Sequence, residues 1–389
     1  MSTTAYLDHA ASTPVRPEAR DAMLPLLGEL HGNPSSAHAP GRAARTVLER
    51  ARREVAAAVD AEPAQVFFTS GGTEADNLAV LGAVLGAGRN GTAPIAVVGA
   101  SEHKAVLASA HAATRFGGGE IVLPVDASGA VDVTALRTAL ARRPAVVSVM
   151  WANNETGILA DLASITLACA EAGVPFHTDA VQALRYLEVP ATVPPIDLLT
   201  ISGHKLGAPK GIGALVVRSR ALLEPLLHGG SQQHGLRPGT ENVAGAVALG
   251  VAMRLATAER ADEARRVGAL RDALERRLLA AVPDAQVIGA DVPRVPHISA
   301  VVAPGTETSA LLMHLDRLGV AASGGSACTT GSPEPSHVLQ AMGLPRALAL
   351  GFVRFSLGRE STEGDIARAA AAYPEAVARA RRTEGALHG

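Results

Sequence analysis

Short apolar runs that end in polar or glycine-rich turns alternate with helical stretches along the chain. The clearest runs lie at 66–69, 95–98, 146–150, 175–177 and 197–201. This alternation predicts an α/β fold with a mostly parallel sheet. Runs such as AVVSVM are apolar at nearly every position, so we expect a sheet covered on both faces. Functional groups should then gather in the loops at the carboxyl ends of the strands.

A helical pattern with apolar residues three and four apart runs from about 243 to 281, as one long helix or two joined helices. We place a domain boundary inside it, near residue 262. Beyond it, VPHISAVVA and GFVRFSLG are typical of strands, and 365–382 is typical of a terminal helix. The prediction is a large domain at 17–262 and a smaller α+β domain formed by 1–16 and 263–389.

Net charge, the length of apolar runs and cysteine spacing disfavour several classes of protein. The formal charge of −2 gives no basic surplus that would draw the protein directly to nucleic acid or to an anionic membrane. No stretch reaches the roughly 18 apolar residues that a membrane helix needs, and the N-terminus lacks the pattern of a signal peptide. The two cysteines have no disulfide-framework or zinc spacing. We expect a soluble, unprocessed, cytoplasmic protein without a structural metal.

The segment VFFTSGGTEADN predicts a strand, a glycine turn at Gly72 and a helix that begins near Thr73. Free backbone N–H groups and the helix dipole make such a turn a candidate phosphate site. The segment lacks the GxxxxGK[ST] pattern of a P-loop. An ordinary turn with a threonine cap is the alternative.

In VPFHTDAVQAL, Asp179 follows a strand and Gln182 comes three residues later. A carboxylate there can pair with a protonated ring nitrogen of a cofactor, and the amide can hydrogen-bond a ring substituent. An aspartate before an apolar run is also a common helix cap, so the structural alternative stays open at this point.

Lysine occurs only at 104, 205 and 210, which makes lysine chemistry easy to place. Lys205 lies with Ser202 and His204 in a compact loop between two strands, IDLLTISGHKLGAPKGIGALVV. A lysine that forms a Schiff base needs partial desolvation or nearby cations so that its amine can be neutral. Lys205 fits this requirement, whereas we expect Lys104 and Lys210 to be surface charges.

The two cysteines lie in contrasting surroundings. Cys328 stands in VAASGGSACTTGSPEPS, which has no hydrophobic periodicity, and this predicts a mobile loop with a reactive thiol. Cys169, in SITLACAEAG, falls on the apolar face of a predicted helix, where cysteine behaves as a small hydrophobic residue.

Ten motifs then occur in order along nearly the whole chain: YLDHAASTP, HGNPSSAH, TSGGTEADN, EHKAV, ANNETG, HTDAVQ, SGHKLGAPKG, RPGTEN, GSAC and VRFSLG. The chain resembles the cysteine desulfurase family of the class V aminotransferase superfamily, close to its NifS and IscS branch. The resemblance implies a homodimer that binds pyridoxal 5′-phosphate in fold type I. Its large domain would hold a mostly parallel seven-stranded sheet, and its smaller α+β domain would carry the catalytic cysteine loop.

The resemblance also implies roles for the residues of this chain that match the family's motifs. The resemblance implies that Lys205 forms the Schiff base, that Asp179 pairs with the pyridine nitrogen and that His103 lies over the cofactor ring. Gln182 would lie near the phenolic oxygen. The phosphate would be held by Gly72, Thr73, Ser202 and His204 of one subunit and by Thr240 of the other. The substrate carboxylate would be held by Arg354, with Asn153 and Asn33 close by.

The implied reaction converts L-cysteine to L-alanine and leaves a persulfide on Cys328 for delivery to an acceptor or scaffold protein. Iron–sulfur cluster assembly, tRNA thiolation and DNA phosphorothioation all begin with such a persulfide. The alternatives are a selenocysteine lyase or another class V aminotransferase, which would not need Cys328, and a catalytically silent scaffold for a sulfur acceptor. A dinucleotide enzyme is disfavoured because no GxGxxG fingerprint is present.

Overall fold

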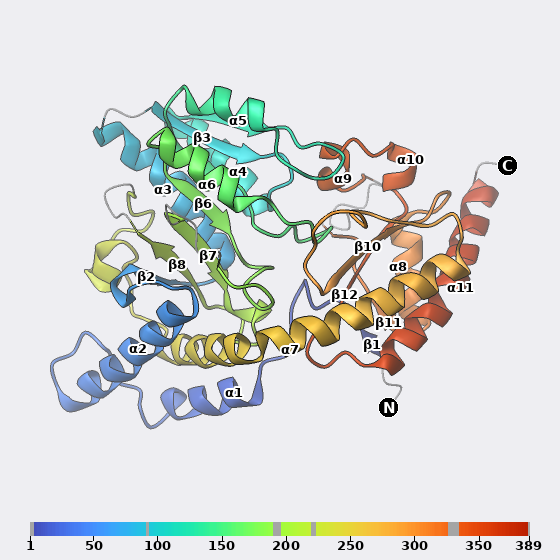
Figure 1. Cartoon of the computed structure of the whole chain (residues 1–389). Coiled ribbons are helices and arrows are strands. Elements are labelled where there is room, and N and C mark those ends of the chain that lie inside the picture. The colour runs from blue at the N-terminus through green and yellow to red at the C-terminus, as the bar shows by residue number, and fades with distance from the viewer. Residues whose placement is uncertain (1–3, 91–92, 190–195, 219–222, 326–333, 388–389) are drawn as a thin grey trace.

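Seven strands form one sheet in the larger part of the molecule (Figure 1). The computed structural model describes residues 4–90, 93–189, 196–218, 223–325 and 334–387. Across the sheet, the strands are β2 (Val66–Thr69), β8 (Gly213–Val217), β7 (Leu198–Ser202), β6 (Phe176–Asp179), β5 (Pro144–Ser148), β3 (Ala93–Gly99) and β4 (Gly119–Leu123). Only β8 runs antiparallel to its neighbours. The predicted mostly parallel seven-stranded sheet is confirmed.

Helices cover both faces of this sheet because alternate strand residues are apolar on each side. Phe67 and Val98 pack under α3 (Gly72–Asn90) and α4 (Lys104–Ala113). Phe68 and Val97 face the opposite core. That core is completed by α2 (Ala39–Ala58), α5 (Val133–Leu140), α6 (Leu162–Glu171) and the first half of α7 (Val243–Ala281), against which α1 (Pro17–Met23) also packs.

Helix α7 joins the two parts of the molecule (Figure 1). It is a single helix of 39 residues, so the first of the two predicted arrangements is the observed one. Its buried residues up to Ala256 belong to the core of the large sheet. From Val267 onward they belong to a second core. The change of packing partner therefore falls in the interval that contains residue 262.

The smaller part is built on an antiparallel sheet of β12 (Phe352–Ser356), β10 (Ile298–Val302) and β9 (Gln286–Val287). Strands β10 and β12 coincide with the two runs predicted from the sequence. Near the N-terminus, β1 (Ala5–Tyr6) pairs in parallel with β11 (Val320–Ala321). The accompanying helices are α8 (Thr308–Arg317), α9 (His337–Ala341), α10 (Arg346–Ala349) and the C-terminal α11 (Glu363–Leu387).

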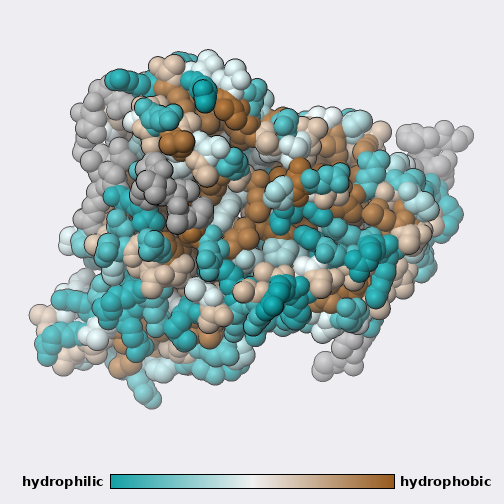
Figure 2. All heavy atoms as spheres, in the orientation of Figure 1, coloured by the Kyte–Doolittle hydropathy of each residue, from teal (hydrophilic) through white to brown (hydrophobic). Residues whose placement is uncertain are grey.

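Figure 2 shows the surface in the orientation of Figure 1. Hydrophilic residues line the exposed side of α7, and apolar residues lie in separate patches between elements. Among the described residues, no helix combines the length and the apolar character that crossing a membrane requires.

Candidate active site

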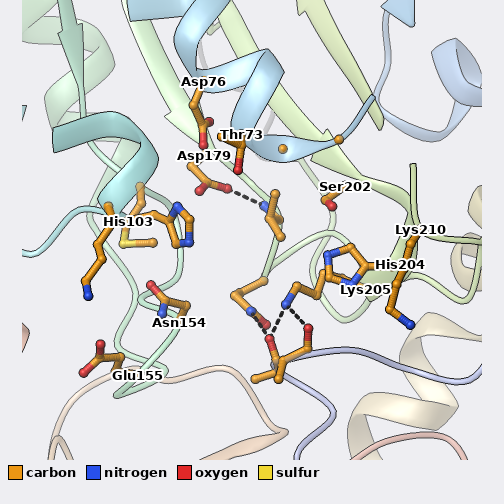
Figure 3. Close-up of a pocket in the computed structure, with 18 of the residues that line it drawn as sticks. Thr73, Asp76, His103, Asn154, Glu155, Asp179, Ser202, His204, Lys205 and Lys210 are labelled. Carbon is orange, nitrogen blue, oxygen red and sulfur yellow. Dashed lines mark hydrogen bonds between the residues drawn. The ribbon is translucent and has the colours of Figure 1, made fainter. Parts of the chain in front are cut away.

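A cavity of about 570 Å³ opens at the carboxyl ends of β5, β6 and β7 (Figure 3). This is the edge at which α/β sheets place their ligands, and the volume suits a small-molecule site. Both parts of the molecule contribute to its wall. Nine predicted site residues line it: Gly72, Thr73, His103, Asp179, Gln182, Ser202, His204, Lys205 and Arg354.

One end of the cavity is formed by the turn between β2 and α3. A Cβ on Gly72 would lie 3.3 Å from Val181 Cγ2 and 3.4 Å from Ser202 Cβ, so the turn packs closely against the end of β7. The first N–H groups of α3 have no partner within the helix, and with the Thr73 and Ser202 hydroxyls they suit a phosphate. Burial lowers the pKa of His204 to about 4, so its imidazole is neutral there.

Asp179 ends β6 and is buried at the bottom of the cavity. Its Oδ1 accepts a hydrogen bond from Val181 N at 2.9 Å. Burial raises the pKa of Asp179, and the nearby His103 and Lys205 oppose that rise. A buried carboxylate needs a cationic partner to stay ionised, and a protonated ring nitrogen would supply one.

Lys205 lies in a short turn directly after β7. Its Nζ donates hydrogen bonds to the carbonyl oxygens of Ala10 and Ala11, the latter at 2.7 Å. Burial, followed by the charge of Arg354, lowers the pKa of Lys205 to about 7. A large fraction of the amine is therefore neutral near neutral pH, as a Schiff-base nucleophile requires.

Gln182 and His103 are both fixed by hydrogen bonds at the cavity wall. Gln182 Nε2 donates to Ala10 O at 2.9 Å. His103 caps α4, and its Nδ1 accepts a hydrogen bond from Ala105 N at 3.1 Å. Burial lowers the pKa of His103, so the neutral ring carries its proton on Nε2.

Arg354, on β12, reaches the cavity from the smaller part. Its Nη2 pairs with Asp8 Oδ1 at 2.8 Å and its Nη1 donates to Asn154 O at 2.7 Å. Its buried Nε has no hydrogen-bond partner within the described residues. A lysine, a buried carboxylate, a helix-start turn and an arginine fork thus surround one small-molecule cavity.

Comparison with known proteins agrees with this arrangement. Residues 5–368 match the family model described as "Aminotransferase class-V". The cysteine desulfurase of Gluconacetobacter diazotrophicus is 45% identical over 97% of this chain and 94% of that protein. The chain belongs to the class-V aminotransferases. Within them it groups with the cysteine desulfurases, and the family assignment made from the sequence motifs is confirmed.

Two further comparisons cover almost the whole chain. The IscS-like cysteine desulfurase of Mycobacterium tuberculosis is 43% identical over 99% of each chain. A solved structure described as a NifS-like protein superposes with a TM-score of 0.88 at 30% identity, covering 96% of this chain and 99% of that one.

Class-V aminotransferases and cysteine desulfurases depend on pyridoxal 5′-phosphate. The cavity suits this group: a phosphate fits the turn at Gly72, a protonated pyridine nitrogen fits Asp179, and an aldehyde fits the largely neutral Lys205 amine. Donors and acceptors of the right chemistry therefore lie together in this class-V aminotransferase.

Asp76, which the sequence analysis did not single out, lies beside Asp179. Ligand atoms of Asp76, His103 and Asp179 lie within 4.8 Å of one another, a spacing that a metal ion could also use. Burial and the charge of Asp179 raise the pKa of Asp76 well above its usual range. Two buried carboxyl groups this close rarely ionise together, so Asp76 is the one expected to carry a proton when Asp179 is ionised.

Three of the predicted residues that the structure describes do not line the cavity. Asn153 is buried in a turn, where its Oδ1 accepts hydrogen bonds from the backbone N of Glu155 and Thr156 at 2.9 Å each. Asn33 and Thr240 are exposed and lie outside the lining of their own chain's cavity. Cys328 lies outside the described residues.

The structure adds lining residues that sequence reasoning missed. Besides Asp76, they include Asn154, Glu155 and His337. For Asn154 and Glu155 the available signal was the ANNETG motif, because an Asn side chain at the start of a turn often hydrogen-bonds the turn's own backbone and leaves its neighbours to face outward. Lys104 and Lys210 are exposed, as expected, although both lie at the rim of the cavity.

Proposed function

We propose that the protein converts L-cysteine to L-alanine and keeps the sulfur as a persulfide on Cys328 for delivery to an acceptor protein. The observation that carries this proposal is Lys205, held in the same cavity as Asp179 and Arg354 with a pKa lowered to about 7. The acceptor would belong to iron–sulfur cluster assembly, tRNA thiolation or DNA phosphorothioation.

Lys205, Asp179 and His103 would each have a separate role around the cofactor ring. When bound, pyridoxal 5′-phosphate supplies an electron sink for the bond-breaking steps at the substrate α-carbon. Lys205 supplies the attaching amine and then a base for the α-proton. Asp179 would pair with the ring nitrogen, and this cationic partner would keep the carboxylate ionised while the carboxylate keeps the nitrogen protonated. His103 holds a proton at Nε2, from which it can donate into the cavity.

Arg354 is the group best suited to hold the substrate carboxylate. A guanidinium gives two parallel hydrogen bonds to a carboxylate, which a lysine cannot do. Asp8 occupies Nη2 at 2.8 Å and is partly exposed, so it is the group that an incoming carboxylate would displace or join. Asn154 holds Nη1 through its backbone carbonyl oxygen and fixes the direction of the fork.

Cys328 would take the sulfur as a thiolate. The S–S bond forms as the substrate C–S bond breaks, the carbon keeps the electron pair, and a proton completes alanine. Ser323, five residues before Cys328 in the sequence, exchanges backbone hydrogen bonds with Arg354 in both directions. The position of Ser323 supports Cys328 as the acceptor of sulfur from a substrate held at Arg354.

The proposal includes a homodimer. Thr240 would reach the cofactor phosphate of the partner subunit, and Asn33 would approach the substrate there. Their exposure outside their own chain's cavity supports a role across an interface. Twofold-symmetric dimers, which would hold two equivalent sites, are the commonest soluble homo-oligomers.

The test is release of alanine and sulfide from L-cysteine in the presence of a reductant. Wild type should be yellow and active, and Lys205→Ala should lose both the colour and the activity. Cys328→Ser should stay yellow and lose desulfuration. Full desulfuration by Cys328→Ser would contradict the persulfide step and favour a lyase or aminotransferase.

A further inference from the structure

His297 contacts Gln182 from the other part of the molecule. It immediately precedes β10 and is buried, with 4% of its surface exposed. Its Nε2 lies 3.2 Å from Gln182 Oε1. Its Nδ1 has no hydrogen-bond partner within the described residues. The contact to Gln182 is therefore the polar interaction that the His297 ring makes in the described structure.

The direction of this hydrogen bond follows from the groups around it. Gln182 Nε2 donates to the carbonyl oxygen of Ala10 at 2.9 Å, so Oε1 is the atom that faces His297. An amide oxygen can only accept, so His297 must donate from Nε2. The ring is neutral, because burial lowers its pKa well below the usual range. The guanidinium groups of Arg185, Arg354 and Arg271 on other segments add to this shift.

The His297 ring is held in one plane. Tyr186 stacks on it with ring centroids 4.5 Å apart and an interplanar angle of 25°. Tyr186 is itself buried and lies four residues after Gln182 in the sequence. Its ring thus supports the imidazole from the same segment that presents the amide.

These contacts disfavour the flipped amide. Turning Gln182 over would set its Oε1 against the Ala10 carbonyl oxygen, which would lose that hydrogen bond. It would also force the His297 proton onto the buried Nδ1, which has no acceptor within the described residues. In the observed orientation Nε2 has two N–H groups and Ala10 takes one. The other remains for a ligand, since Gln182 lines the cavity.

We propose that His297 is a positioning residue that locks the Gln182 amide with one N–H available to the phenolic oxygen of the cofactor. This inference rests on the proposed function, in which Gln182 serves that oxygen. A donor at the phenolic oxygen stabilises its deprotonated form. Losing or reversing the amide therefore raises the pH at which the visible absorption band of the bound cofactor changes.

His297→Gln and His297→Asn form a matched pair, because both bring an amide but only the longer side chain reaches the position of Nε2. We measure the pH midpoint of the visible band in each holoenzyme without substrate. His297→Asn should raise the midpoint by about one pH unit, the scale of a lost hydrogen bond to a charged oxygen. His297→Gln should stay near wild type. Equal midpoints in wild type and His297→Asn would overturn the inference.

Two more variants make the outcome decisive. His297→Phe keeps a ring for Tyr186 to stack on and removes the donor. Its pH midpoint should therefore rise as in His297→Asn, and it controls for any packing defect caused by the smaller asparagine side chain. Gln182→Leu should shift at least as far, and adding His297→Asn to it should cause no further shift. No shift in Gln182→Leu would refute the role of Gln182 itself. A shift in Gln182→Leu without one in His297→Asn or His297→Phe would refute His297 alone.

Discussion

At the scale of single residues, Lys205 gives the sharpest expectation. Its pKa of about 7 means that the neutral amine is the minor form below pH 7 and the major form above it. The rate at which cofactor-free protein takes up pyridoxal 5′-phosphate should therefore rise about tenfold per pH unit below 7 and level off above it. Stopped-flow absorbance between pH 5.5 and 9 measures this rate.

A variant of the neighbouring cation tests the cause of that profile. Arg354 is the second contributor to the lowered pKa of Lys205, after burial. Arg354→Met should therefore move the midpoint of the uptake profile to higher pH. A rate that climbs undiminished to pH 9 in wild type would show that the amine keeps an ordinary lysine pKa.

Several predicted site residues that line the cavity share a simple signal in the sequence. Asp179 and Ser202 end buried strands and Lys205 follows one, so the sheet alone brings them together. Asn153 and Asn154 have no such signal, because the direction of two adjacent side chains depends on the turn. Asn153 Oδ1 accepts hydrogen bonds from the backbone of the turn, whereas Asn154 lines the cavity.

At the scale of elements, predictions held where an element carries its own pattern. Strands β2, β5 and β12, and the long helix α7, are periodic or apolar along most of their length. The two-residue strands β1, β9 and β11 escaped prediction because two residues are too few to show a pattern of their own. For β1 and β11 the partner also lies at the other end of the chain, and a local pattern cannot encode it.

The packing of α7 on α2 depends on Gly250. A Cβ there would lie 3.1 Å from Ala51 Cα and 2.7 Å from Glu54 Oε2, closer than such atoms normally pack. Gly250→Val should lower the free energy of unfolding by about 1–3 kcal/mol through overpacking. Chemical denaturation of the holoenzyme measures this change.

Gly268, on the same helix, provides the control. A Cβ there would meet only Pro296 Cβ, at an ordinary 3.5 Å. Gly268→Val should change the free energy of unfolding by less than about 0.5 kcal/mol. Equal losses in the two variants would mean that the close approach of α2 does not set the cost, because valine has a higher helix propensity than glycine at both positions.

At the scale of the whole molecule, the cavity lies between two parts that the sequence separates by many residues. Arg354 reaches the wall from β12, and the Ala10 and Ala11 carbonyls that hold Lys205 come from the N-terminal segment. Motif order suggested the members of this site, but their mutual contacts depend on how the two parts pack. Thr240 and Asn33 lie outside the cavity of their own chain, so their proposed roles depend on the assembly of two chains.

Mixed dimers decide whether Thr240 serves the partner's cavity. Lys205→Ala removes the attaching amine, and Thr240→Glu places a negative charge where the phosphate is expected. If Thr240 acts across the interface, one site of the mixed dimer combines both defects and the other combines an intact Lys205 with an intact Thr240. Co-expressed, differently tagged chains should then recover about half the wild-type desulfuration per mixed dimer, although each variant alone is inactive. If Thr240 acts on its own chain's cavity, every site keeps one defect, so a mixed dimer without activity would place Thr240 in cis.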